Sequence, residues 1–135
     1  MGTHRAGDYM GLVATLKNNA PYRLLVSIAL CQGAGILGSV ATAPAINSWY
    51  VTLTKPWFTP PNWVFAPAWT TLYLLMGVAH SMVWARYPEH PSSRRGLTIF
   101  YIQLALNIAW SFLFFGLRSP LLGLVGIVPL WISIL

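Results

Sequence analysis

The sequence predicts an all-α integral membrane protein that crosses the bilayer several times. Of its 135 residues, 56% are hydrophobic and only 7% are charged, whereas soluble domains carry about a quarter charged residues. The apolar residues gather in long runs, and a helix needs about 20 such residues to cross a bilayer. The net charge of +6 comes from scattered Lys and Arg with almost no acids, which favours membrane orientation over nucleic-acid binding. We therefore expect a multi-pass membrane chain that contacts the lipid bilayer and has no nucleic-acid partner.

The chain divides into an N-terminal tail and one transmembrane domain. Residues 1–23 are mixed in composition, and we expect them to form a surface or disordered tail. Residues 24–135 are expected to form a single transmembrane domain, with its first helix at about 24–42. This helix is rich in Gly, Ala and Ser, which let helices approach closely in lipid. Basic residues concentrate in the tail and around residues 86–95, so the positive-inside rule places both of these segments inside.

Three more helices are predicted after a long irregular loop. The loop at about 43–66 is rich in prolines and aromatic residues and has no helical periodicity, so it lies at the interface or folds back onto the helix ends. The other helices are expected at about 67–87, 97–115 and 120–135. Pro67 stands in the first turn of its helix, where a missing N–H costs least. The last run has about 15 residues and barely crosses a bilayer, so we expect truncation within or after the fourth helix.

Two of the helices carry stripes of polar and aromatic side chains at helical spacing. The stripes consist of Trp69, Tyr73, Met76, His80 and Trp84 in one helix and of Gln103, Asn107, Trp110 and Ser111 in the next. Facing each other, they would line a pocket with π surface and a few hydrogen-bonding groups, which suits a flat hydrophobic ligand. Helix packing and interfacial anchoring produce the same pattern, so both readings stay open. For His80, packing as a neutral histidine is favoured over ligation of haem.

The sequence offers no pattern for catalysis or metal binding. The acids Asp8 and Glu89 lie in the tail and in a loop, and the three histidines are too scattered for a metal cluster. We therefore predict no catalytic residue, no metal site and no cofactor, with porphyrin or haem only as a candidate ligand. On the far side of the third helix, Ala105 and Ala109 form a small-xxx-small pair, which predicts a homodimer interface.

Two long motifs resemble the signatures of a known family. The first contains, in this order, Trp49-Tyr50, Lys55-Pro56, Pro60-Pro61, Trp69 and Leu72-Tyr73, and the second runs from Gln103 to Trp110 and on to Phe114-Phe115-Gly116. The motifs are similar to those of the translocator protein family, also called TspO/MBR, tryptophan-rich sensory protein or peripheral-type benzodiazepine receptor. The resemblance covers roughly Gly35 to Arg118.

The resemblance implies a five-helix transmembrane bundle, often dimeric, with a ligand cavity capped by the loop after the first helix. Members of the family bind porphyrins, sterols and benzodiazepine-type drugs. Matching of motif positions, with Tyr73 added from its stripe, assigns ligand-binding roles to residues of the first three helices and of the loop junction. These residues are Trp69, Asn107, Trp110, Phe65, Ala66, Ala68, Tyr73, Gly35, Gly38 and Ser39.

Three functions from different classes fit this pattern. We rank first the binding or transport of a flat hydrophobic ligand, a porphyrin or other tetrapyrrole or a sterol, in tetrapyrrole handling or a stress response. The second is enzymatic: light- and oxygen-dependent porphyrin breakdown. We expect that activity to be weakened here, because the resemblance places another pocket tryptophan and a sterol-recognition motif on a fifth helix that would follow Leu135. The third is a structural or regulatory membrane subunit without a small ligand.

Overall fold

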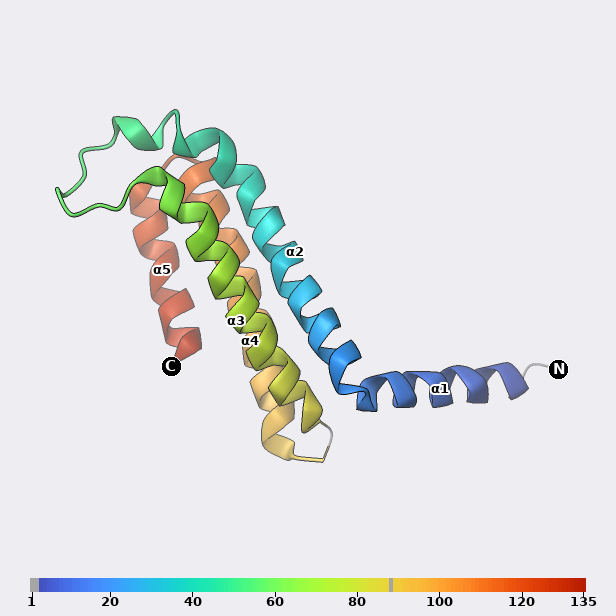
Figure 1. Ribbon diagram of the computed structural model, residues 1–135. Helices are drawn as coiled ribbons and strands as arrows, with labels where there is room; N and C mark the ends of the chain where they lie inside the picture. Colours follow the sequence, from blue (N-terminus) through green and yellow to red (C-terminus); the bar gives the residue numbers. More distant parts are fainter. Residues whose placement is uncertain (1–2, 88) are drawn as a thin grey trace.

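The computed structural model describes residues 3–87 and 89–135, and within these ranges every regular element is a helix. Figure 1 shows a bundle of helices lying side by side and an N-terminal helix that leaves the bundle at a steep angle. The bundle helices are α2 (Ala20–Ile46), α3 (Phe65–Ala85), α4 (Pro91–Ser111) and α5 (Pro120–Ile134). The other elements are α1 (Thr3–Asn18), the short 3-10 helices η1 (Tyr50–Thr52) and η2 (Asn62–Val64), and the π-helical η3 (Phe112–Gly116).

Two stretches of the bundle are long and apolar enough to cross a membrane. They are α2 and the continuous stretch Pro91–Gly116 of α4 and η3, whose most apolar 18-residue windows have mean hydropathies of 1.9 and 1.7. Only 28% and 22% of their most apolar windows are buried, whereas the core helix of a soluble protein would be mostly buried. α5 is a shorter apolar helix beside them. Apolar side chains therefore cover much of the outside of the bundle.

The helix interiors agree with the sequence predictions, and the differences lie at the ends. The first predicted helix, 24–42, is too short on both sides. α2 begins at Ala20 because Asn19 caps it, accepting a hydrogen bond from the N–H of Tyr22 at 3.4 Å, and it continues through Pro44 to Ile46. α4 begins at Pro91 rather than at 97, since the polar residues that follow Pro91 are compatible with a helix. α3 and α5 lie within two residues of their predicted bounds.

The N-terminal segment differs from the predicted tail at 1–23. Residues 3–18 form α1, and residues 20–23 already belong to α2. Ala, Leu, Met and Lys favour helix by intrinsic propensity even without the long apolar run of a spanning helix. Tyr9, Met10 and Leu12 of this helix are 64%, 75% and 56% exposed, and the division of the chain into a tail and a transmembrane domain stays a prediction.

Small residues allow the bundle helices to meet closely. A Cβ atom on Gly77 of α3 would lie 2.7 Å from the Cα of Ile28 in α2, so the two backbones touch because residue 77 has no side chain. Two buried clusters surround the line of contact. One consists of Cys31, Ala34, Tyr73 and Leu104, and the other of Ala41, Ala45 and Phe115.

His80 joins three helices inside the bundle. Its side chain is 3% exposed, with Nδ1 2.8 Å from Ser27 Oγ of α2 and Nε2 2.8 Å from the Tyr101 hydroxyl of α4. Ser27 donates its own proton to the carbonyl of Arg23, so its oxygen accepts from Nδ1–H, and Nε2 of the neutral ring accepts from Tyr101. Both ring nitrogens are occupied by protein partners. This arrangement is that of a packed, hydrogen-bonded histidine rather than a haem ligand.

α5 is held against α4 by an indole hydrogen bond. Trp110 Nε1 donates to the carbonyl of Gly123 at 2.9 Å. A Cβ atom on Gly123 would collide with the ring of Phe114, so this close approach requires glycine. Residues 117–119 connect η3 to α5, and Arg118 adopts a left-handed φ of 51° within this turn.

Candidate functional site

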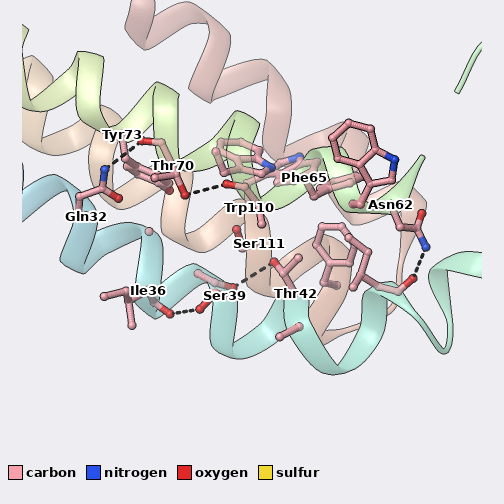
Figure 2. A pocket seen from close by; sticks show the side chains of 18 of the residues that line it. Gln32, Ile36, Ser39, Thr42, Asn62, Phe65, Thr70, Tyr73, Trp110 and Ser111 are labelled. Atoms are coloured by element: carbon pink, nitrogen blue, oxygen red, sulfur yellow. Dashed lines mark hydrogen bonds between the residues drawn. The ribbon is translucent and has the colours of Figure 1, made fainter. Parts of the chain in front are cut away.

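A cavity of about 450 Å³ lies between α2 and α3, next to the loop that joins them (Figure 2). α2 forms one side, α3 and the loop form the other, and the last turn of α4 with η3 closes the inner end. The lining residues are Gln32, Gly35, Ile36, Gly38, Ser39, Thr42, Ala43, Ile46, Asn47, Asn62, Trp63, Phe65, Ala66, Trp69, Thr70, Tyr73, Trp110, Ser111 and Phe115. None of these residues is charged, so the cavity offers aromatic surface with a few neutral hydrogen-bonding groups.

Two glycines of α2 make room for the inner wall. A Cβ atom on Gly35 would lie 2.8 Å from Cδ2 of the Tyr73 ring, and one on Gly38 would lie 3.0 Å from Ser111 Oγ. Tyr73 is 4% exposed, and Phe115 of η3, another lining residue, is 2% exposed. The inner wall is therefore packed against α2, and a larger residue at position 35 would push the tyrosine ring away.

The cavity opens sideways between α2 and α3. Five of its exposed lining residues lie on these two helices, namely Ile36, Ser39, Ala43, Ala66 and Thr70, and the other two, Asn47 and Trp63, belong to the loop that joins the helices. The lining residues from α4 and η3, in contrast, are buried or half-buried.

Apolar side chains surround this mouth on the α2 side. Ile36 is 66% exposed, and its neighbours Leu37 and Val40 are 56% and 63% exposed. Ile36 lies about 15 Å along the helix axis from the end of α2, at 1.5 Å per residue. When α2 spans a bilayer, such a surface would face acyl chains, and the mouth would then open toward lipid.

Two hydrogen bonds hold the rim of the cavity. Gln32 Nε2 donates to the carbonyl of Thr70 at 2.9 Å and links α2 to α3 at one end (Figure 2). Asn62 Nδ2 donates to the carbonyl of Ile46 at 3.1 Å and links the loop to the last residue of α2 at the other end. The second bond also satisfies a carbonyl that the helix end leaves without an intrahelical partner.

Aromatic rings form one face of the cavity. Trp69 of α3 and Trp110 of α4 lie 6.4 Å apart between ring centroids, with 34° between their planes, and Trp69 and Tyr73 lie 5.9 Å apart at the same tilt. Two further contacts hold the Trp110 ring in place. It stacks on Phe114, with ring centroids 5.1 Å apart, and its Nε1 donates the hydrogen bond to α5. The indole pair is a preformed wall against which a flat ligand can lie.

The structure brings eight of the ten predicted site residues to the cavity. They are Trp69, Trp110, Phe65, Ala66, Tyr73, Gly35, Gly38 and Ser39. Ala68 does not line it, because it stands about 100° around α3 from Trp69 and is exposed on another face. Asn107 is 6% exposed and lies one turn of α4 away from Ser111, outside the lining, and its Oδ1 has no hydrogen-bond partner. Binding by all ten residues remains a prediction.

Other lining residues were not predicted from the sequence, for two reasons. Ile36, Thr42, Ala43 and Ile46 continue the helical period that begins at Gly35, so the period itself was a usable signal. Asn47, Asn62 and Trp63 come from the loop, whose path no periodicity predicts.

The α3 stripe divides into two parts. Its last three members, Met76, His80 and Trp84, pack inside the bundle, so helix packing explains that part of the stripe. Within residues 3–87 and 89–135, no three His, Cys, Asp or Glu side chains meet as metal ligands do.

Comparison with known proteins gives a consistent result. The model of the TspO/MBR family matches residues 27–135. The chain is 44% identical over 113 residues to tryptophan-rich protein TspO of Archaeoglobus fulgidus, covering 84% of this chain and 72% of that protein. It is 37% identical over 109 residues to protein CrtK of Rhodobacter capsulatus, covering 81% and 66%. It is 39% identical over 95 residues to the translocator protein of Bos taurus, covering 70% and 56%.

The matched region includes α3, α4, α5 and most of α2, and thus every residue that lines the cavity. The motif resemblance seen in the sequence and the bundle seen in the structure fall within the same residues. The chain therefore belongs to the TspO/MBR family and is a helical membrane protein.

Proposed function

We propose that this protein binds a flat, hydrophobic ligand of the tetrapyrrole class, with sterols as a second class, and holds or moves it within the membrane. The observation that supports this most directly is the aromatic cavity with its mouth toward lipid. Its volume of about 450 Å³ lies within the range of small-molecule sites, about 300–1,000 Å³. A related protein carries the name tryptophan-rich sensory protein, and another the name translocator protein. The ligand would be cargo rather than a resident cofactor.

The distribution of polar groups favours a ligand with an apolar body and a polar edge. Amides and hydroxyls of Gln32, Ser39, Thr42 and Asn62 line the cavity together with the indoles of its aromatic wall. A macrocycle stacked on Trp69 would place its polar substituents near the rim, where amides and hydroxyls can bond them. No charged side chain is among the lining residues, so the cavity offers no ion-pair partner to a carboxylate group.

Asn107 is proposed as an additional contact beneath the cavity. Its buried Oδ1 lacks a partner, and a buried acceptor without a hydrogen bond is costly. A donor group of a deeply seated ligand, or a water molecule that enters with it, would satisfy this oxygen.

A titration tests the proposal directly. The detergent-solubilised protein is titrated with protoporphyrin while tryptophan fluorescence is followed, and the same is done for the double variant Trp69→Phe, Asn107→Ala. We expect saturable quenching that the variant weakens by more than about tenfold, which corresponds to about 1.4 kcal/mol. Trp131→Phe is the matched control, since Trp131 is exposed on α5 and lies outside the cavity. Equal affinities in the double variant and the control would reject a specific pocket.

A second candidate function is light- and oxygen-dependent porphyrin breakdown. The observation that favours it is the Trp69–Trp110 pair, whose indoles lie 6.4 Å apart in the cavity wall, where they would contact an excited macrocycle. The complex is illuminated in oxygenated buffer, and the products are separated by chromatography. Loss of new products in Trp69→Phe and Trp110→Phe, with porphyrin binding retained, would support enzyme activity. Product formation at the rate of free porphyrin would leave binding or transport as the function.

We further propose a multi-pass arrangement and a homodimer. α2, α3, α4 and α5 would correspond to four of the five transmembrane helices that the family resemblance implies. Ala105 and Ala109 are both exposed on α4, and Ala109 borders a shallow apolar hollow with Phe112, Leu113, Gly116 and Leu117. Small residues beside such a hollow allow the close helix contact on which membrane dimers depend.

A further inference from the structure

The loop between α2 and α3 presents two large aromatic side chains away from the protein. Trp57 is 95% exposed and Phe58 is 68% exposed. The centroids of their rings lie 5.7 Å apart, with 88° between the ring planes. Among the described residues, the aromatic ring that contacts Trp57 is that of Phe58. Neither side chain lines the cavity. The pair therefore has a role neither in the packing of the bundle nor in the proposed site.

The backbone of the loop holds this pair in place. The N–H and hydroxyl of Thr59 both donate to the carbonyl of Pro56, at 3.1 Å and 2.8 Å, and close a turn around the two aromatics. On one side Lys55 Nζ donates to the carbonyl of Tyr50 at 2.7 Å, and on the other Asn62 bonds the end of α2. Both flanks of the turn are tied to the protein, whereas its tip is not.

The tip stands at the end of the membrane-spanning helices. α2 ends and α3 begins at this loop, and the turn from η3 to α5 is at the same end, since Trp49 of the loop contacts Phe114 of η3 at 5.5 Å. Figure 1 shows the loop reaching outward past the bundle at this end. The ends of spanning helices coincide with the headgroup region of a bilayer, where tryptophan is enriched.

The charge of the loop agrees with this location. Residues 47–64 contain no acid and a single base, Lys55, whose ammonium group is turned toward the Tyr50 ring, 4.3 Å from its centroid. The turn thus brings no carboxylate to the headgroups, and the rings of Trp57 and Phe58 are exposed at its tip.

We propose that Trp57 and Phe58 insert into the boundary between lipid headgroups and acyl chains and fasten the loop to the bilayer. An indole suits this boundary because its ring is apolar and its N–H remains available to polar groups. The segment so fastened leads directly to Asn62 and Trp63, which line the cavity. The bilayer, and not only the protein, then sets the position of the cavity's cover.

Depth-dependent fluorescence quenching tests the insertion without any ligand. The full chain is reconstituted into phosphatidylcholine vesicles whose acyl chains are brominated near the headgroup or near the chain end. Subtracting the emission of Trp57→Phe from that of the wild type isolates the Trp57 signal. Trp131→Phe gives the matched control, because Trp131 is 61% exposed on α5 and lies about 16 Å along that helix from Pro120.

We expect the Trp57 signal to be quenched more by shallow than by deep bromine, and the Trp131 signal more by deep bromine. A Trp57 signal quenched by aqueous iodide and insensitive to brominated lipid would overturn the proposal in favour of solvent exposure. Insensitivity to both quenchers would overturn it in favour of a protein contact, such as a second copy of the chain.

A spin label provides a second readout that is independent of the other tryptophans. Trp57→Cys is labelled with a nitroxide, since the native Cys31 is fully buried and does not react. Oxygen dissolved in lipid should relax the label more than a water-soluble nickel chelate does. The reverse order would contradict insertion even if the fluorescence result were ambiguous.

Discussion

Gly35 stands where the ring of Tyr73 approaches the backbone of α2. In Gly35→Ala the new Cβ would lie 2.8 Å from the ring, so the ring must shift or the helices must separate. We expect the free energy of unfolding to fall by about 1–3 kcal/mol, the usual cost of overpacking. Unfolding in detergent, followed by circular dichroism, measures the change. Gly33→Ala is the control, because nothing lies within 4 Å of a Cβ there; equal stabilities would show that the contact is not tight.

The hydroxyl of Tyr101 is the partner of His80 Nε2. Tyr101→Phe keeps the ring contact with His80, at 5.4 Å, and leaves a buried nitrogen unpaired. We expect a loss of about 1–3 kcal/mol, the desolvation cost of an unsatisfied buried group. Tyr9→Phe, on the exposed face of α1, should change stability little and serves as the control. Indistinguishable denaturation midpoints would mean that the hydrogen bond contributes nothing.

The sequence predicted the helix face on which a residue lies better than the position of that residue along the helix relative to the cavity. Helical period placed Trp69 and Tyr73 on the inner face of α3, and both lie there. The same period excludes Ala68, which the motif match included. Asn107 shares a face with Ser111, but the cavity ends at the level of Ser111, and no period encodes where along a helix a cavity stops.

At the scale of elements, the facing sides of α2 and α3 form the proposed passage for ligand. Ala43→Trp would put a large ring on the exposed rim of the mouth. We expect porphyrin association and dissociation to slow by a similar factor, with the dissociation constant nearly unchanged, because the ring obstructs entry more than it alters the inner wall. Stopped-flow porphyrin fluorescence measures both rates.

Leu25→Trp is the matched control for this passage. Leu25 is 68% exposed near the other end of the same helix and does not line the cavity. Rates that respond equally to both substitutions would mean that ligand enters elsewhere, for example beneath the loop.

Helices were predictable as elements because long apolar runs dominate them. The ends of the helices were less predictable, because they depend on single capping residues and on tertiary contacts. After the cap at Asn19, α2 begins four residues before the predicted position, and α4 begins at Pro91, six residues before its predicted position. α1 was missed as a helix because its sequence lacks the apolar run on which the prediction of spanning helices relied.

At the scale of the whole molecule, the proposed dimer depends on the outward face of α4. Ala109→Leu fills the space beside Gly116 and should shift the protein toward monomers, because close helix contact needs small residues. Sedimentation in detergent measures the change. Ala68→Leu, an equal enlargement on an exposed part of α3, is the control. A dimer fraction unchanged by both would place any interface elsewhere.

The fold class followed from composition, whereas the arrangement of the helices did not. Charge and apolar content alone predicted a helical membrane bundle, and the family match agrees. The close contact of α2 with α3 depends on the absence of side chains at Gly35 and Gly77, and the lining of the cavity depends also on the path of the loop. These are contacts between distant residues, and local patterns do not encode them.

Under the proposed function, the lateral mouth would also set the concentration scale on which ligand occupancy depends. For a ligand that arrives through the acyl chains, the effective concentration is its mole fraction in lipid and not its molarity in water. Adding empty vesicles at constant total ligand would dilute it and drain the cavity, although the aqueous volume stays the same. Affinities measured for this protein are therefore comparable only at a stated ratio of ligand to lipid.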